Sequence, residues 1–207
     1  MIDRQDIELL LNRARVSLTG ASADELKMSL FDVLTEFFND SSCWTEAVAF
    51  NAIAGTTLYN IAPTEGQIIR LAGVTDLNNL SVPALMPVVG QVMLAFDPNA
   101  TVQYFATVVK NVVLPLTKDM YPIGPDWVLP LWHIGILDGL LGRMMAQLNK
   151  SYRHAVQSEY HLKRFRDVIA RARVTKLRGN THNTQAWRFP QGFATRSQQG
   201  GRSERQF

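Results

Sequence analysis

Few residues in this sequence stand at spacings that could support catalysis. Asp32 and Glu36 fall one helical turn apart and could in principle act as a carboxylate pair, but acids exposed on a helix explain them better. The single cysteine, Cys43, has no histidine placed to activate it as a nucleophile, and we expect a small buried residue beside Trp44. The sequence therefore gives no candidate catalytic residue, and we expect that the chain is not an enzyme.

The residue types that commonly bind metals and cofactors are also scattered along the sequence. The histidines are His133, His154, His161 and His182. His154 and His161 are seven residues apart, two helical turns, which is too far to share a metal directly. A single cysteine forms neither a thiolate zinc site nor an internal disulfide, and no glycine-rich phosphate loop is present. We expect no metal and no cofactor.

Charge is distributed unevenly along the 207 residues, although the net charge is only +3. Residues 1–149 carry 8 Lys and Arg against 15 Asp and Glu, whereas residues 150–207 carry 13 against 3. An acidic body with a basic C-terminal quarter indicates an acidic partner, either nucleic acid or a protein surface. The polar N-terminus does not have the pattern of a signal peptide, and the apolar stretch 127–142 is too short and too interrupted to span a membrane. We expect a protein made in the cytoplasm, with no membrane contact.

Apolar residues at helical spacing predict four helices. The first covers residues 3–17, and the second begins at a capping box formed by Ser22 and Glu25 and ends near residues 39–42. The third runs from about residue 124 to 149, and Ser151 can cap the fourth, over about 152–176. The residues predicted to form the apolar side of the fourth helix are Val156, Tyr160, Leu162, Phe165, Ile169 and Ala172.

The third helix carries Gly135, Gly139, Gly142 and Ala146 near one stripe. Because each glycine costs a helix roughly 1 kcal/mol, three of them need a reason, and small side chains let another helix approach closely. The stripe fits ordinary packing inside the subunit, which we favour, or a contact between subunits.

Short runs rich in Val, Ile, Thr and aromatic residues lie between the second and third helices. They predict strands near 44–53, 57–61, 67–75, 89–96 and 101–113. We therefore predict a mainly α fold with a β insertion, in the α+β class. Residues 1–42 and 116–178 would form a four-helix bundle core, residues 43–115 a small antiparallel β region, and residues 179–207 an extended C-terminal tail.

Two basic segments near the C-terminus are the candidate binding sites. The tail has no apolar periodicity and cannot form a core by itself, yet it contains aromatic and arginine residues of the kind that anchor interfaces. The tail residues predicted to contact a partner are Trp187, Arg188, Phe189, Phe193 and Arg196. A tail without a partner, or a strand folded back on its own domain, stays open. The predicted basic face of the fourth helix comprises Lys163, Arg164, Arg166, Arg171, Arg173 and Lys176.

Several segments, taken in order, resemble one class of viral proteins. These segments are residues 11–15 with 18–20, 37–46, 58–71, 135–145, 160–173 and 186–191. In pattern and order they are similar to the head–tail adaptor (connector) proteins of tailed bacteriophages, especially the tail tubular protein A class of short-tailed phages. None of these segments is a catalytic signature.

The resemblance implies a structural virion protein in the neck between capsid and tail. Family members form a homo-oligomeric ring, commonly a dodecamer, that connects the portal to the tail or nozzle protein while double-stranded DNA passes through the centre. The resemblance further implies that the helical core stacks against neighbouring subunits, that the β part faces the tail and that the C-terminal segment docks on the portal. Whether the basic helix faces the portal or the DNA stays open.

The main alternative is a nonspecific nucleic-acid-binding protein that uses the basic C-terminal quarter. It predicts DNA binding that weakens steeply with salt. It accounts for the charge distribution but not for the β insertion or the tail aromatics.

Overall fold

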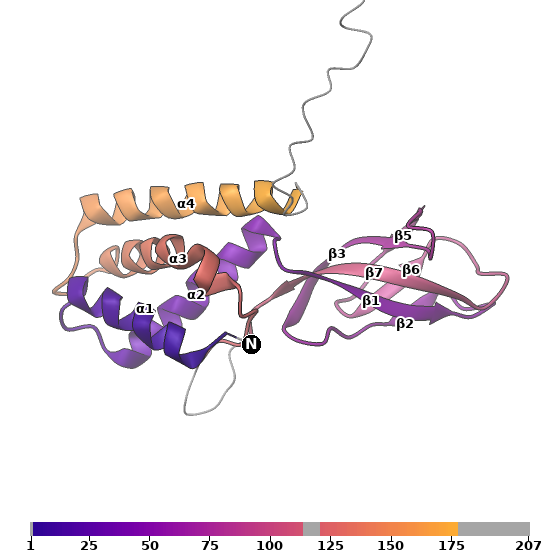
Figure 1. The fold of residues 1–207 in the computed structure, drawn as a ribbon, viewed down its shortest axis with the longest axis horizontal. Helices are drawn as coiled ribbons and strands as arrows, with labels where there is room; N and C mark the ends of the chain where they lie inside the picture. The colour runs from indigo at the N-terminus through magenta and orange to yellow at the C-terminus, as the bar shows by residue number, and fades with distance from the viewer. Residues whose placement is uncertain (1, 114–120, 178–207) are drawn as a thin grey trace, which may run out of the picture.

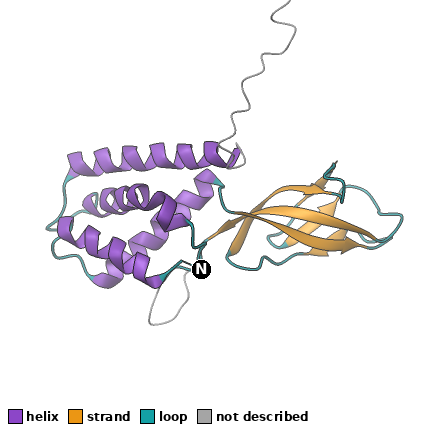
Figure 2. Ribbon diagram, viewed as in Figure 1, coloured by secondary structure: helices purple, strands orange, loops and turns teal. Residues whose placement is uncertain are grey.

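The computed structural model describes residues 2–113 and 121–177. The helices in this part of the chain are α1 (Arg4–Ser17), α2 (Ala23–Ser41), α3 (Val128–Met145) and α4 (Ala155–Leu177). The strands are β1 (Thr45–Ala52), β2 (Leu58–Asn60), β3 (Gln67–Thr75), β4 (Ser81–Val82), β5 (Ala84–Leu85), β6 (Gln91–Leu94) and β7 (Val102–Asn111). The helices gather in one part of the molecule and the strands project from its end, as Figures 1 and 2 show. Whether the two parts are independent domains stays a prediction.

The prediction of a mainly α fold with a four-helix bundle core is wrong. The fold is an α+β mixture of helices and two antiparallel sheets, and the helices share one hydrophobic cluster without being arranged as a four-helix bundle. Helix α4 packs along α3 and against α2, while α1 packs against α3 and α2, so that α3 lies between α4 and α1 (Figure 1). The cause is that α3 is apolar nearly all round, and such a helix is stable only when it is covered on several sides.

The sequence predicted the starts of α1 and α2 correctly and the starts of α3 and α4 wrongly. Ser22 caps α2 by accepting a hydrogen bond from Glu25 N at 3.2 Å, which confirms the predicted cap. Helix α3 begins at Val128, after the turn at 124–127 where the sequence placed its start, and α4 begins at Ala155. Ser151 is not its cap, because the Ser151 hydroxyl donates to the carbonyl of Thr19 at 3.1 Å.

The larger sheet has the strand order β1-β7-β3-β4 and the smaller sheet the order β2-β6-β5, all neighbours antiparallel. β1 pairs with β7 from Thr45↔Val109 to Ala52↔Val102 without a shift. The side chains that both sheets bury form a hydrophobic cluster separate from that of the helices. The five predicted strands correspond to β1, β2, β3, β6 and β7. β4 and β5 were missed because two residues are too few to show an alternating pattern.

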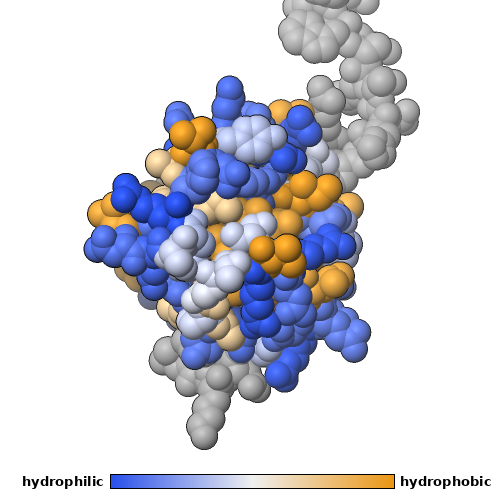
Figure 3. All heavy atoms as spheres, turned by 90° about the vertical axis from the view of Figure 1, so that its left-hand side faces the viewer, coloured by the Kyte–Doolittle hydropathy of each residue, from blue (hydrophilic) through white to orange (hydrophobic). Residues whose placement is uncertain are grey.

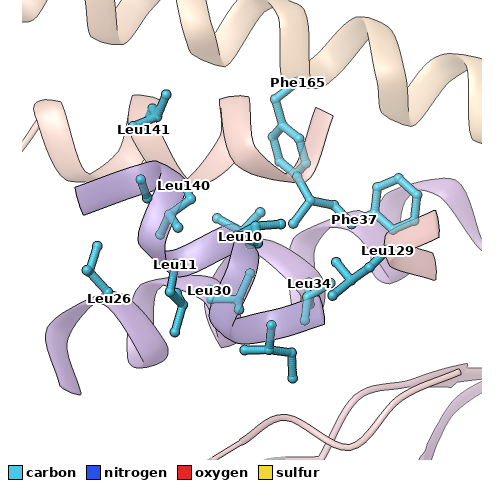
Figure 4. Packing of buried hydrophobic residues seen from close by; sticks show 14 of the residues in the cluster. Leu10, Leu11, Leu26, Leu30, Leu34, Phe37, Leu129, Leu140, Leu141 and Phe165 are labelled. Carbon is cyan, nitrogen blue, oxygen red and sulfur yellow. The ribbon is translucent and has the colours of Figure 1, made fainter. Parts of the chain in front are cut away.

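Leucine and phenylalanine side chains fill the helical core. Figure 4 shows leucines of α1 and α2 meeting beneath α3, with Phe165 reaching into the same cluster from α4. Leu11, Leu30, Leu34 and Leu140 are fully buried. This cluster positions the inner face of α4.

The glycines of α3 face α4 within the subunit, which supports ordinary close packing and not a subunit contact. A Cβ on Gly135 would lie 2.7 Å from Val168 Cβ, and one on Gly139 would lie 2.9 Å from the Phe165 ring. Gly142 meets Leu162 in the same way, at 2.8 Å. Such distances are shorter than a normal van der Waals contact, so only glycine permits this separation of α3 and α4.

We expect Gly135→Ala to lower the free energy of unfolding by up to about 2 kcal/mol. The overpacking against Val168 costs about 1–3 kcal/mol, and the better helix propensity of alanine offsets about 1 kcal/mol. Urea denaturation measures the difference. Gly73→Ala in β3 is the control, because nothing lies within 4 Å of the added Cβ. Equal effects of the two substitutions would contradict the packing argument.

Contacts around a buried lysine at the base of the larger sheet join the β part to the helical part. Lys110, at 5% exposure, places Nζ 2.6 Å from Glu46 Oε2 and 4.4 Å from the centre of the Trp44 ring. Glu46 also accepts hydrogen bonds from the backbone N and the hydroxyl of Thr64, at 3.1 and 2.6 Å. Asn111 Nδ2 donates to Asn39 Oδ1 of α2 at 3.0 Å. These contacts fix the base of the larger sheet against the end of α2.

We expect Glu46→Gln to destabilise the fold by about 3 kcal/mol, because it leaves the charge of Lys110 buried without its anion. Burial raises the pKa of Glu46, but hydrogen bonds from Lys110 and Thr64 together lower it below its ordinary value of 4.5. The ion pair therefore stabilises the fold above about pH 4.5 and loses its effect as the pH falls through the lower folded pKa.

Thermal unfolding of the unmodified chain and of the Glu46→Gln variant, measured from about pH 3 to about pH 7, checks this, because the range spans the ordinary carboxyl pKa. The stability difference should be largest at neutral pH and shrink in acid. Glu159→Gln, an exposed residue of α4, is the control and should change stability by less than about 0.5 kcal/mol. A difference that does not depend on pH would show that the charge of Glu46 contributes nothing.

Candidate partner interfaces

The five tail residues predicted to contact a partner, Trp187, Arg188, Phe189, Phe193 and Arg196, lie outside the described residues. Their role stays a prediction. The surfaces that the structure does describe are the outer side of α4, a groove beside the start of α4 and an apolar region of the β part.

Helix α4 has a narrow inner face and a wide outer one. Ser158, Phe165, Ile169 and Ala172 are buried, and the Ser158 hydroxyl donates to the carbonyl of Gly142 at 2.7 Å. The assignment of Val156 and Tyr160 to the same apolar side is wrong, because 75% and 57% of their surfaces are exposed. At about 3.6 residues per turn both residues fall on the side of α4 that lies opposite the buried Phe165.

The six residues of the predicted basic face all lie on α4, but the structure separates them into two groups. Arg164 Nε lies 3.2 Å from Asp138 Oδ2, and Arg173 donates to the carbonyl of Asp40. Lys176 is half-buried, and both its burial and the charge of Arg70 lower its pKa. In the described part of the chain the other three form no ion pair, namely Lys163, Arg166 and Arg171.

A buried acid ties α4 to α3, and the sequence reading did not single it out as a site. Asp138 of α3 is 5% exposed and meets His161 Nδ1 at 2.8 Å as well as Arg164. The signal in the sequence was a single acid within the apolar stretch 127–142. Because its partners come from α4 alone, the cluster fixes the packing of the two helices.

A shallow groove of about 520 Å³ opens where α3 ends and α4 begins. Arg153, Lys163 and Arg166 line it together with one acid, Glu159, over an apolar floor that includes Leu162. The excess of positive charge suits an acidic group of a partner. The groove is open to solvent and contains no described cluster of groups that could carry out bond chemistry.

The β part exposes apolar side chains around a second groove of about 430 Å³ between β3 and the segment 84–89. Leu85, Val88 and Val89 are 46%, 60% and 58% exposed, and Leu77 and Leu80 at the β3–β4 turn are 62% and 64% exposed. The exposed apolar residues beside this groove, Leu85, Val88 and Val89, are typical of a surface that contacts another molecule.

The carboxylate pair considered for catalysis is held by an arginine. Arg143 lies 3.3 Å from Asp32 and 2.6 Å from Glu36, which explains the spacing of the two acids as a salt bridge between α2 and α3. Across residues 2–113 and 121–177, His, Cys, Asp and Glu form no group of three that could hold a metal ion. Among the described helices, none has both the length and the hydrophobicity needed to cross a bilayer.

Comparison with known proteins does not identify the chain, because no protein-family model and no curated protein matches it.

Cys43 is half-buried, and its sulfur lies 3.0 Å from the Ser41 hydroxyl. Burial raises the pKa of the thiol, so little thiolate is present at neutral pH. We expect alkylation of the folded chain by iodoacetamide to be on the order of tenfold or more slower than that of the urea-unfolded chain. Mass spectrometry over time measures both rates. Equal rates would show that Cys43 is an accessible thiol.

Proposed function

We propose that this chain is the subunit of a head–tail adaptor ring in a tailed bacteriophage, which connects the portal of the capsid to the tail. Several segments, taken in their order along the sequence, resemble those of the adaptor class, and this resemblance suggests the role. The observation that carries it is the chemical difference between the two ends of an elongated chain: an apolar β part and a basic outer helix.

A connecting protein needs two distinct surfaces held at a fixed distance. Leu85, Val88 and Val89 provide an apolar surface on the β part, and Lys163 and Arg166 a basic one on the helical part. The contacts of Lys110 with Trp44 and of Asn111 with Asn39 join the two parts. In the proposal the β part meets the tail or nozzle protein, and the helical part meets the portal.

The C-terminal residues supply the strongest contact with the portal in this proposal. Trp187, Phe189 and Phe193 would fill apolar pockets of the portal, and Arg188 and Arg196 would pair with its acids. A segment whose composition cannot form a core gains order from its partner and can cover a large surface. Ring closure, in a dodecamer as in the family, repeats each contact once per subunit, so weak single contacts add up.

The second candidate is a nonspecific nucleic-acid-binding protein, favoured by the exposed cations Lys163, Arg166 and Arg171, which have no ion-pair partner among the described residues. In an adaptor a channel wall must let DNA slide, so a surface that grips phosphates is unsuitable there. The basic side of α4 therefore fits the portal better than the channel.

The test is co-sedimentation of the full chain with portal rings encoded in the same genome. We expect the unmodified chain to bind and the variant Trp187→Ala/Phe189→Ala to lose most of its binding, because the aromatic anchors are removed. The matched control Gln198→Ala/Gln199→Ala should bind like the unmodified chain. If no form binds, even at low salt, the portal contact is wrong. Binding to any DNA that falls steeply with salt would then support the second candidate.

A further inference from the structure

Helix α4 has a second apolar stripe that points away from the molecule. The stripe follows a spacing of four and three residues along the outer face, and its apolar residues, Val156, Tyr160, Ala170, Val174 and Leu177, lie on either side of the charged pair Lys163 and Asp167. At about 3.6 residues per turn it lies opposite the buried Phe165. Val156, Val174 and Leu177 are 75%, 44% and 77% exposed. Figure 3 shows apolar side chains among hydrophilic ones on the end of the helical part.

This spacing is that of a helix that packs against another helix. Apolar residues that alternate at four and three positions form the seam of a coiled coil, and polar residues within such a seam set its register and its partner. The inner face of α4 is already covered by α3 and α2, so the seam has no partner inside the subunit. A helix that exposes such a seam over its whole length is typical of an interface between chains.

The polar residues at the middle of the seam identify the partner. Lys163 and Asp167 have opposite charges one helical turn apart. In an antiparallel pair of these helices, Lys163 of each copy would therefore lie against Asp167 of the other copy. The same register places Val156 opposite Val174 of the second copy and Tyr160 opposite its Ala170. Two valines meet, a large residue meets a small one, and two ion pairs form, so the seam is complementary to itself.

We propose that two copies of this chain pair through the outer seam of α4, antiparallel and around a two-fold axis. The proposal goes beyond the adaptor function and does not rest on it, because it concerns the free chain alone.

The two arginines that flank the seam near the two-fold axis differ in how strongly their charge would oppose pairing. Arg164 would lie near its own copy, but Asp138 at 3.2 Å compensates its charge and its guanidinium lies 5.6 Å from the Tyr160 ring centre. Arg166 has no ion-pair partner among the described residues and would face Arg166 of the second copy. The pair should therefore be stronger when the charge of Arg166 is removed.

A purely acidic partner, whether DNA or a protein, explains the seam less well. It would gain nothing from Val156 or Val174, and Asp167 would repel it from the middle of the surface. An acidic partner also predicts the reverse effect at Arg166, since removal of that charge would then weaken binding.

Sedimentation equilibrium of the full chain up to several hundred micromolar tests the proposal. We expect a monomer–dimer equilibrium. Lys163→Asp and Asp167→Lys should each weaken it about tenfold or more, because each converts two attractive pairs into two repulsive ones. The double variant Lys163→Asp/Asp167→Lys should return to within about threefold of the unmodified chain. Circular dichroism and the Tm of each variant show that it folds.

Two further variants give opposite expected results. Arg166→Gln should tighten the pair, and Val174→Glu should abolish it, while Arg13→Gln, at an exposed position of α1 away from the seam, should leave it unchanged. A chain that stays monomeric at all concentrations overturns the proposal. So does a double variant that fails to recover, an Arg166→Gln variant that pairs more weakly, or an oligomer that none of the α4 substitutions affects.

Discussion

The arrangement of the helical part depends on how closely α3 and α4 approach. Helix α3 is apolar on almost every side, so it must be covered on several sides to avoid exposing that surface. Gly135 and Gly139 allow α4 to lie directly on it, because any Cβ there would overlap Val168 or Phe165. Asp138 then links to His161 and Arg164 and fixes the rotation of α4 about its own axis. Once that rotation is set, the composition of the outer face follows from the sequence.

A different interaction sets the position of the β part. Lys110 is buried at the end of β7, where its charge is balanced by Glu46 and its ammonium lies over Trp44. Gly66 can approach the Trp44 ring only because it has no side chain and adopts a φ of +79°. The strands therefore leave the helical part from a base that is joined to it by the contacts of Lys110 with Trp44 and of Asn111 with Asn39.

The sequence predicted most elements but not how they pack. Helical and alternating periodicity located the helices and the longer strands because these patterns extend over many residues. The four-helix bundle was wrong because periodicity shows that a helix has an apolar side without showing which helix covers it. Val156 and Tyr160 were assigned to the inner face because α4 has apolar residues on two opposite faces, and a single-face reading merges them. The buried role of Asp138 and Lys110 depends on residues distant in sequence, which no local pattern contains.

The two proposals place different symmetry requirements on the chain. A two-fold contact through α4 is complete with two copies, whereas a ring needs a head-to-tail contact in which different faces meet. The seam of α4 cannot serve both at once, so subunits of a ring must meet through other faces, or the free pair must open before the ring closes. The exposed acid Asp24 of α2 is suited to a head-to-tail contact with a basic residue of a neighbour. Pairing through α4 would then delay ring assembly in the free protein. Assembly would begin where a partner displaces the second copy from the basic helix.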